Sequence, residues 1–189
     1  KESKIVSEDS AAKHRAKQTL NNLLLALVAS LGIMIAIVLI VPRDDSNRIQ
    51  PVDHIALAAE AKTASGHEVL APELPQGWWA NHAKWVSTAS DGVEYWEVGF
   101  VGPKNQYIGL TQAFAVNPTW VALRSAGFVP DESFAGAPKW LKQTPGPKVE
   151  ADQVLWTLDL ESDYVSLEGN ASPDEFAEFA QLVETELDK

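Results

Sequence analysis

The hydrophobic and polar positions divide the chain into one long apolar run and a following region of short alternating patterns. Residues 23–41 contain no charged residue and no proline. At about 1.5 Å per residue, a helix over this run spans roughly 28 Å, close to the bilayer's hydrocarbon core of about 30 Å. A helix in a soluble core would need a polar face, which this run lacks. The pattern therefore predicts a transmembrane helix over residues 20–41.

A cleaved export signal is the main alternative for the apolar run. The apolar part of a signal peptide is about 7–15 residues long and precedes a small-x-small cleavage site. The run here is longer, and it ends in Val41, Pro42 and Arg43 without such a site. The chain has no cysteine for lipid attachment. We therefore expect a permanent single span.

The charges on either side of the run predict its orientation. Residues 1–19 carry five Lys or Arg and three Asp or Glu, whereas the two arginines of residues 42–50 are offset by two aspartates. An excess of Lys and Arg marks the cytoplasmic side. We therefore predict a plasma-membrane protein with a cytoplasmic tail over 1–19, a linker over 42–50 and an extracytoplasmic domain over 51–189.

Strands and helices of the domain are predicted from local patterns. Apolar and other residues alternate over 93–102 and again over 106–114, which is typical of half-buried strands. A helix is expected within 51–66, where Gly66 ends an alanine-rich run. A second helix is expected to begin after its N-cap Asn117 and to end near Gly127.

The last helix is the most strongly specified element. Ser172 is a suitable N-cap, Pro173 occupies the first helical position, and Glu175 completes a capping box. The following apolar residues recur at helical spacing, so one face should pack on the sheet. These residues are Phe176, Phe179, Ala180, Val183 and Leu187.

The domain also contains an internal repeat, residues 83–127 and 138–187. Landmarks such as Trp96 and Trp156, or Tyr107 and Tyr164, recur at a separation of 55 to 60 residues. Each half predicts three strands and a helix. The expected fold class is α+β: a mostly antiparallel sheet of about six strands, built from two strand-strand-strand-helix units with helices packed on it.

Charge and composition narrow the function further. The formal net charge is −11, and the residues after the span hold ten Lys or Arg against 23 Asp or Glu. Such an acidic domain argues against nucleic-acid binding, which requires basic surface. The negative charge would keep an exported domain soluble, or it would attract a basic partner. Without cysteine there is no disulfide, thiolate nucleophile or Cys-zinc site.

No catalytic, metal or cofactor site is predicted, and we do not expect an enzyme. The histidines of the domain, His54, His67 and His82, lack the spacing of a helical zinc pair, and no nucleophile-elbow motif is present. An enzyme would require these histidines to converge with a carboxylate.

Two groups of residues are candidate interface positions. Ala29, Gly32 and Ala36 form a stripe of small residues that allows a second helix to approach the span closely. Trp78 and Trp79 lie in a segment rich in proline and glycine, where they could cap the core edge, stack on a glycan or anchor a protein interface.

Several segments carry a resemblance to a known family. They are VPR after the span, QPVDHIALAAEA at 50–61, ELPQGWW at 73–79, WEVGF at 96–100 and QYIGLTQ at 106–112. They resemble an actinobacterial family of membrane-anchored extracytoplasmic proteins whose domain has no known function. The chain departs from the family pattern at His54, where a tryptophan often stands. The resemblance implies a location in the cell envelope and transfers no catalytic residue.

Topology and resemblance together lead to a functional hypothesis. Actinobacterial respiratory supercomplexes, which join cytochrome bcc to the terminal oxidase, contain small single-span accessory subunits of this topology. We expect a non-catalytic accessory subunit of such a membrane complex, with its subunits and the lipid bilayer as partners. The alternative is a membrane-anchored module that binds lipid or glycan between sheet and helix, which an apolar pocket with a few polar groups would favour.

Overall fold

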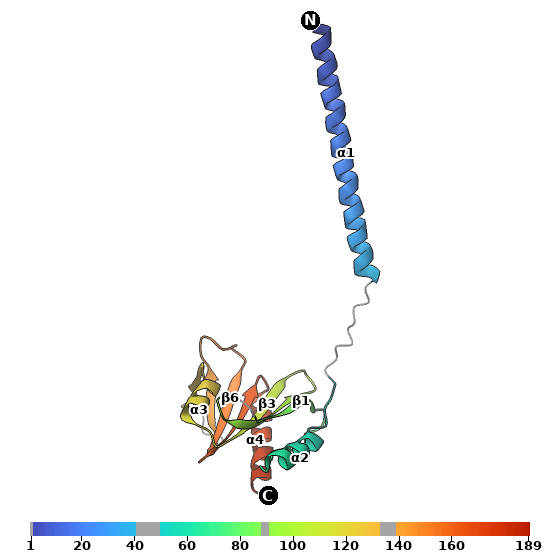
Figure 1. Cartoon of the computed structure of the whole chain (residues 1–189). Helices are drawn as coiled ribbons and strands as arrows, with labels where there is room; N and C mark the ends of the chain where they lie inside the picture. Colours follow the sequence, from blue (N-terminus) through green and yellow to red (C-terminus); the bar gives the residue numbers. More distant parts are fainter. Residues whose placement is uncertain (1, 41–49, 88–90, 133–138) are drawn as a thin grey trace. The chain divides into compact units, whose positions relative to one another are not determined.

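The computed structural model describes residues 2–40, 50–87, 91–132 and 139–189. The chain divides into two compact units, residues 1–48 and 49–189 (Figure 1). The predicted linker over 42–50 lies almost entirely outside the described residues.

The described residues of the first unit form a single helix, α1 (Glu2–Ile40). Its segment Lys17–Ile40 has a mean hydropathy of 3.1, and the large apolar side chains there are exposed all around the helix. The Ser30 hydroxyl donates to the Leu27 carbonyl oxygen at 2.9 Å, so this polar group is satisfied within the helix. The helix is therefore long and apolar enough to cross a membrane.

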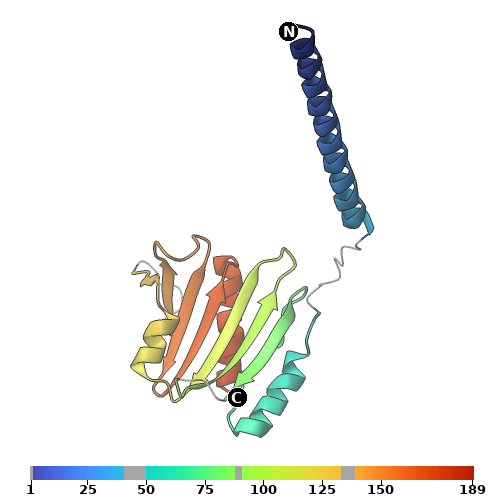
Figure 2. The same ribbon diagram turned by 45° about the horizontal axis from the view of Figure 1, so that its top comes forward.

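The second unit is built on a seven-stranded antiparallel sheet with the order β1-β2-β3-β7-β6-β5-β4 (Figure 2). The strands are β1 (Trp79–Val86), β2 (Glu94–Val101), β3 (Tyr107–Phe114), β4 (Phe128–Pro130), β5 (Leu141–Pro145), β6 (Val154–Leu160) and β7 (Asp163–Gly169). Three helices accompany them: α2 (His54–Ser65), α3 (Pro118–Arg124) and α4 (Pro173–Leu187). The α+β class is confirmed. The strand beyond the expected six is β4, an edge strand too short to produce an alternating pattern.

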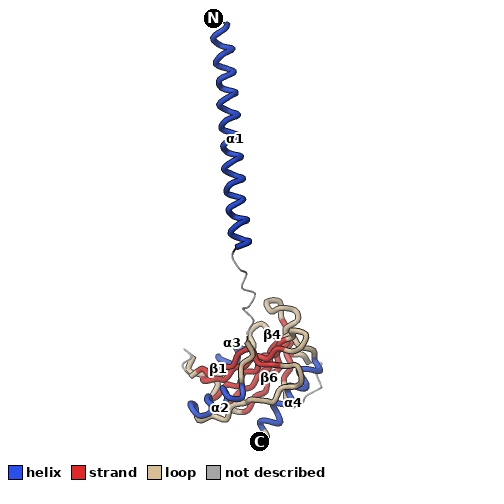
Figure 3. Tube along the Cα trace, turned by 90° about the vertical axis from the view of Figure 1, so that its right-hand side faces the viewer, coloured by secondary structure: helices blue, strands red, loops and turns tan. Residues whose placement is uncertain are grey.

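The predicted repeat appears in the strand order. Strands β1, β2 and β3 form one half of the sheet, β5, β6 and β7 form the other, and β3 pairs with β7 between them. Trp96 and Trp156 occupy the same face. The two helices that end the halves differ, because α3 has 7 residues, α4 has 15, and they lie on opposite faces of the sheet (Figure 3).

The two faces of the sheet have different coverings. Alternate residues of each strand point to opposite faces. One face packs on α2 and α4 and forms the main core, whose largest fully buried side chains include Trp96, Phe100, Ile108, Leu110, Trp156, Leu167, Phe176 and Phe179. Among the described helices, α3 alone packs on the other face, and it covers one end through Trp120, which clusters with Val93, Ala113 and Tyr164. We call this second face the open face; its central residues are Glu97, Gly99, Tyr107, Gly109, Thr111, Ser166 and Glu168.

The predicted caps Gly66, Asn117 and Ser172 are confirmed. Gly66 ends α2 with a φ of 77°, and the structure adds Asp53, whose side chain accepts from the backbone N–H of Ala56 at the start of that helix. The Asn117 side chain caps α3, which ends at Arg124, slightly before the expected stop. Ser172 and Glu175 form the expected capping box of α4.

Polar side chains attach the segment after α2 to the covered face. The Gln112 side chain accepts from the Leu70 N–H at 2.8 Å and donates to the Glu68 carbonyl oxygen at 2.9 Å. The Trp96 indole donates to the Leu70 carbonyl oxygen at 3.0 Å. Since an unpaired buried peptide group costs about 1–3 kcal/mol, these bonds allow the segment to lie in the core.

Candidate binding site

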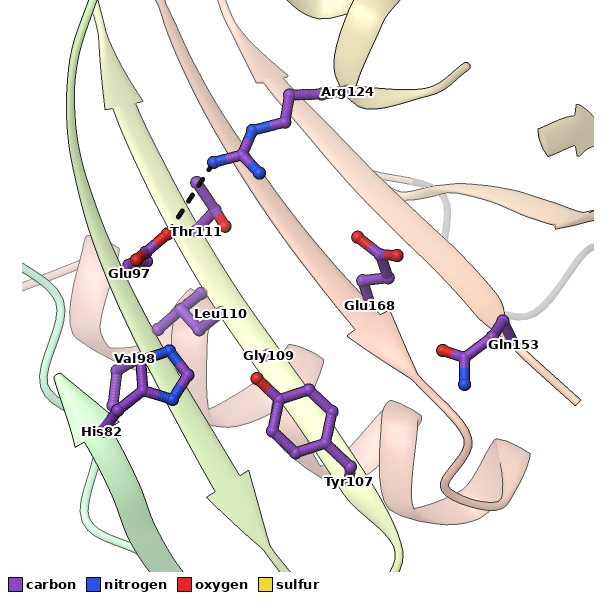
Figure 4. Close-up of a pocket in the computed structure, with 10 residues that line it drawn as sticks. All are labelled: His82, Glu97, Val98, Tyr107, Gly109, Leu110, Thr111, Arg124, Gln153 and Glu168. Carbon is purple, nitrogen blue, oxygen red and sulfur yellow. Dashed lines mark ion pairs between the residues drawn. The ribbon is translucent and has the colours of Figure 1, made fainter. Parts of the chain in front are cut away.

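The open face contains a depression of about 240 Å³ (Figure 4). Its walls come from strands β1, β2, β3 and β7, together with Arg124 of α3 and Gln153 just before β6. Apart from Val98 and Leu110, its residues are polar or glycine: His82, Glu97, Tyr107, Gly109, Thr111, Arg124, Gln153 and Glu168.

Two paired glycines form the floor of this region. Gly99 of β2 lies directly opposite Gly109 of β3. A Cβ atom at Gly99 would clash with the side chains of Asn81 and His82, and one at Gly109 would lie 3.1 Å from the Tyr107 hydroxyl. The missing side chains therefore allow the rings of His82 and Tyr107 to lie against the sheet backbone.

Arg124 is the cation of the depression. Its guanidinium lies 5.0 Å from the ring centre of Tyr95 and 5.1 Å from that of Trp120. One of its nitrogens is 4.0 Å from a carboxylate oxygen of Glu97, the ion pair drawn in Figure 4. The aromatic contacts and this ion pair fix the position of the positive charge.

Glu168 supplies a second carboxylate on the other side of β3. Desolvation by the surrounding side chains raises its pKa, and the charge of Arg124 opposes the rise. The residue is exposed, and its carboxylate forms no ion pair or hydrogen bond with the described residues. Burial also raises the pKa of the Tyr107 phenol, and Glu168 and then Glu97 add to the rise. The charges of Glu97 and Glu168 therefore both raise the pKa of the Tyr107 phenol, which lies on β3 between their two strands.

Tyr164 adds a buried hydroxyl beneath α3. The residue is 4% exposed, and its ring lies 5.7 Å from Trp120 in an edge contact. Its hydroxyl has no hydrogen-bond partner of ordinary geometry in the described residues, although the nearby Thr157 side chain lowers its pKa. Burial is the main cause that raises the pKa of Tyr164 to about 12; Arg124 lowers it and Glu168 raises it.

Comparison with known proteins identifies the family. A family model described as a protein of unknown function (DUF4245) matches residues 15–183. The chain belongs to the DUF4245 family. The match begins within α1 and ends within α4, so the apolar helix and the domain belong to one family pattern. No curated protein and no solved structure matches the chain.

The tryptophans and small residues predicted as interface positions belong to different units of this DUF4245 chain. The ring of Trp78 lies 4.7 Å from Phe179, where it caps the edge of the main core. Trp79 is half-buried at the start of β1, opposite Val101. The stripe of Ala29, Gly32 and Ala36 lies exposed on α1 in the other unit.

The three histidines of the DUF4245 domain occupy separate places. His54 is buried, with Nε2 3.0 Å from the Pro72 carbonyl oxygen. His67 stacks on Phe114 with ring centres 4.1 Å apart, and its Nε2 lies 3.6 Å from Glu94. His82 lines the depression. The described residues contain no group of three or more His, Cys, Asp or Glu side chains that could hold a metal ion.

The space between sheet and helix, where a lipid or glycan was the alternative expectation, is filled by side chains of the core. Phe176 and Phe179 of α4 are fully buried against the sheet. A second depression of about 480 Å³ lies at the end of α4, where Gln112 and Glu68 line it. Both residues already bond the segment after α2 to the sheet. A ligand deep between sheet and helix would require the core to open, whereas one at the edge where α4 meets the sheet would not, so the lipid- or glycan-binding alternative stays a prediction.

Of the residues that line the depression, sequence analysis considered only His82 for a chemical role. The alternation in β2 does place Glu97 and Gly99 on the face opposite Trp96. Glu168 joins them because β7 lies beside β3, and Arg124 joins them because α3 packs on the open face. No local sequence pattern predicts the pairing of β7 with β3 or the packing of α3 on the open face.

Raising the pH from 10 to 12 is expected to lower the free energy of unfolding through Tyr164. In this range an unfolded tyrosine loses its proton, whereas Tyr164 keeps it in the folded domain until about pH 12. The unfolded state then binds fewer protons, so stability falls as the pH rises, by about 2–3 kcal/mol over the range. Urea unfolding at several pH values should show a shallower decline for Tyr164→Phe than for the wild type. Equal declines would contradict the assignment.

Proposed function

We propose that this chain is a non-catalytic accessory subunit of a membrane protein complex. The observation that carries the proposal is the combination of the apolar part of α1, residues 23–40, with a domain that has a closed core and an open sheet face. Such a helix is stable in lipid or against other transmembrane helices. The polar depression on the open face offers groups for contact with another protein.

We further propose that the complex is the actinobacterial respiratory supercomplex of cytochrome bcc and terminal oxidase. Support comes from the resemblance of segments such as residues 50–61 and 73–79 to an actinobacterial envelope family. The topology of one span followed by a domain of ordinary size is that of small accessory subunits.

The orientation in this proposal follows from the flanking charges. Five Lys or Arg against three Asp or Glu precede the span, which favours a cytoplasmic N-terminus. The acidic domain would then lie outside the cytoplasm, where its charge keeps it away from anionic lipid surfaces. Subunits with basic extramembrane segments are the partners that such a domain would attract.

Purification from native membranes tests the proposal. The chain carries a C-terminal tag, the membranes are solubilised in a mild detergent, and the purified material is analysed by mass spectrometry and haem absorption. We expect cytochrome subunits in stoichiometric amounts. The matched control replaces only the predicted span, residues 20–41, by an unrelated apolar sequence of equal length, which keeps the tail and the membrane anchor and tests whether the span contributes to assembly.

The possible outcomes separate the two parts of the proposal. Stoichiometric partners without haem would support an accessory subunit of a different complex. A chain that purifies alone from native membranes would overturn the accessory role.

A further inference from the structure

We infer that the depression on the open face binds one basic side chain, the guanidinium of arginine or the ammonium of lysine, from a partner subunit. The inference rests on the proposed function, because it names the chemistry by which a partner is held. It follows from the net charge of the domain, from the carboxylates and the phenol that line the depression, and from the volume of the depression.

The charge of the domain selects a cation. Residues 49–189 contain eight Lys or Arg and 21 Asp or Glu, a formal charge of −13. A field of this sign concentrates cations near the surface and speeds the encounter with a basic partner. The two carboxylates of the depression, Glu97 and Glu168, outnumber its one arginine, Arg124, so the charge of the lining also favours a cation over phosphate or an anionic headgroup.

Glu168 provides the acceptor for that cation. Glu168 is exposed and lines the depression. Its carboxylate forms no hydrogen bond or ion pair with the described residues, so it is free to accept from a partner's cation. Arg124 lies against Tyr95 and Trp120 and pairs with Glu97. An added cation would occupy the space between Glu168 and the strand of Glu97, where Figure 4 shows the Tyr107 hydroxyl.

The Tyr107 phenol can complete the contacts of the cation. It lines the depression together with Glu97 and Glu168. The Tyr107 ring lies over Gly109, so an aromatic surface borders the same space. Phenolic oxygens accept hydrogen bonds from ammonium or guanidinium groups, and aromatic faces attract them.

The size of the depression favours a single side chain over a free ligand. Its volume of about 240 Å³ is below the range of roughly 300–1,000 Å³ that is usual for small-molecule sites. A side chain that projects from a partner surface needs no larger space, because the rest of the partner lies outside. We therefore assign the occupant to a partner protein.

The direct test uses the full chain in nanodiscs of zwitterionic phosphatidylcholine, so that the lipid does not bind the probe. The probe is the peptide acetyl-Gly-Arg-Gly-amide, and its control contains citrulline, which has nearly the same shape but no charge. Binding is measured by calorimetry and by ligand-observed NMR. We expect the arginine peptide to bind about tenfold or more tightly than the citrulline peptide, since a charged hydrogen bond contributes about 1.5–3 kcal/mol.

Substitutions assign the binding to the depression. Glu168→Gln should weaken the arginine peptide about tenfold or more. The matched control is Glu178→Gln, which removes the same charge from an exposed position on α4. Equal binding of the two peptides to the wild type, or unchanged affinity after Glu168→Gln, would overturn the inference. The peptide comparison requires no variant, so a folding defect cannot conceal the result.

Purification of the same variants from native membranes separates this inference from the proposed function. Loss of partners with Glu168→Gln and their retention with Glu178→Gln would support both. Partners that purify with the wild type while the arginine peptide fails to bind would overturn the inference and leave the accessory role standing. A peptide that binds while no partner purifies would overturn the accessory role and the partner as the source of the cation.

Discussion

Replacing Phe179 by alanine is expected to lower the free energy of unfolding of the domain by about 3–5 kcal/mol. The residue is fully buried, and its ring lies 4.7 Å from Trp78 and 5.4 Å from Phe100. Truncation removes buried apolar surface and leaves a cavity between α4 and the sheet. Since domains of this size are stable by about 5–15 kcal/mol, the variant should lose a large part of its stability. Urea unfolding of the full chain in detergent, followed by tryptophan fluorescence, measures the change.

Leu187→Ala is the control on the same predicted helix face. Leu187 lies in the last turn of α4 and is 36% exposed, so its truncation should cost less than about 1 kcal/mol. Equal losses for the two variants would contradict the packing of α4 described above. A small loss for both would mean that α4 does not close the main core.

The elements that sequence analysis located correctly are those with local signals. The alternation over 93–102 corresponds to β2, and the capping box at Ser172 begins α4. Gly66 ends α2 because its positive φ suits glycine. Each signal lies within a few residues of the element it specifies, so one sequence is sufficient to identify it.

Features that depend on distant contacts could not be predicted in this way. Gln112 faces the covered side of β3, where an apolar residue is the ordinary choice, because its amide pairs with the backbone of a segment 42 residues earlier in the chain. His54 is similar, since its ring bonds to the Pro72 carbonyl oxygen. The reason for such polar residues in a core is visible only when their hydrogen-bond partners are known.

The candidate site could be predicted from the sequence only in part. Glu97, Tyr107 and the paired glycines share a face that the strand pattern already predicts to be opposite the core. Glu168 is brought to them by the pairing of β3 with β7, which depends on how the two halves of the repeat meet. Each half alone would hold part of the depression, so the site is a product of their association.

Two arginines in the middle of the apolar helix, Leu31→Arg with Ile35→Arg, are expected to abolish stable membrane insertion of the chain. Each arginine at a helix centre costs roughly 2.5–3.5 kcal/mol on the insertion scale, whereas leucine and isoleucine are favourable there by about 0.3–0.6 kcal/mol. The pair therefore shifts insertion by about 6–8 kcal/mol, the largest effect expected of any change proposed for this chain. The measurement is the fraction of full-length chain retained in carbonate-washed membranes.

The exchange Leu31→Ile with Ile35→Leu is the matched control, because it alters the same two positions and keeps them apolar. It should leave the chain in the membrane fraction.

Retention of the double-arginine chain would mean that α1 is not the anchor. A wild-type chain that leaves the membrane and has lost the mass of α1 would instead identify the helix as a cleaved export signal. If the full-length wild-type chain stays in the membrane and the double-arginine chain does not, α1 is a permanent anchor. The domain then remains at the membrane surface, where an accessory subunit has to be.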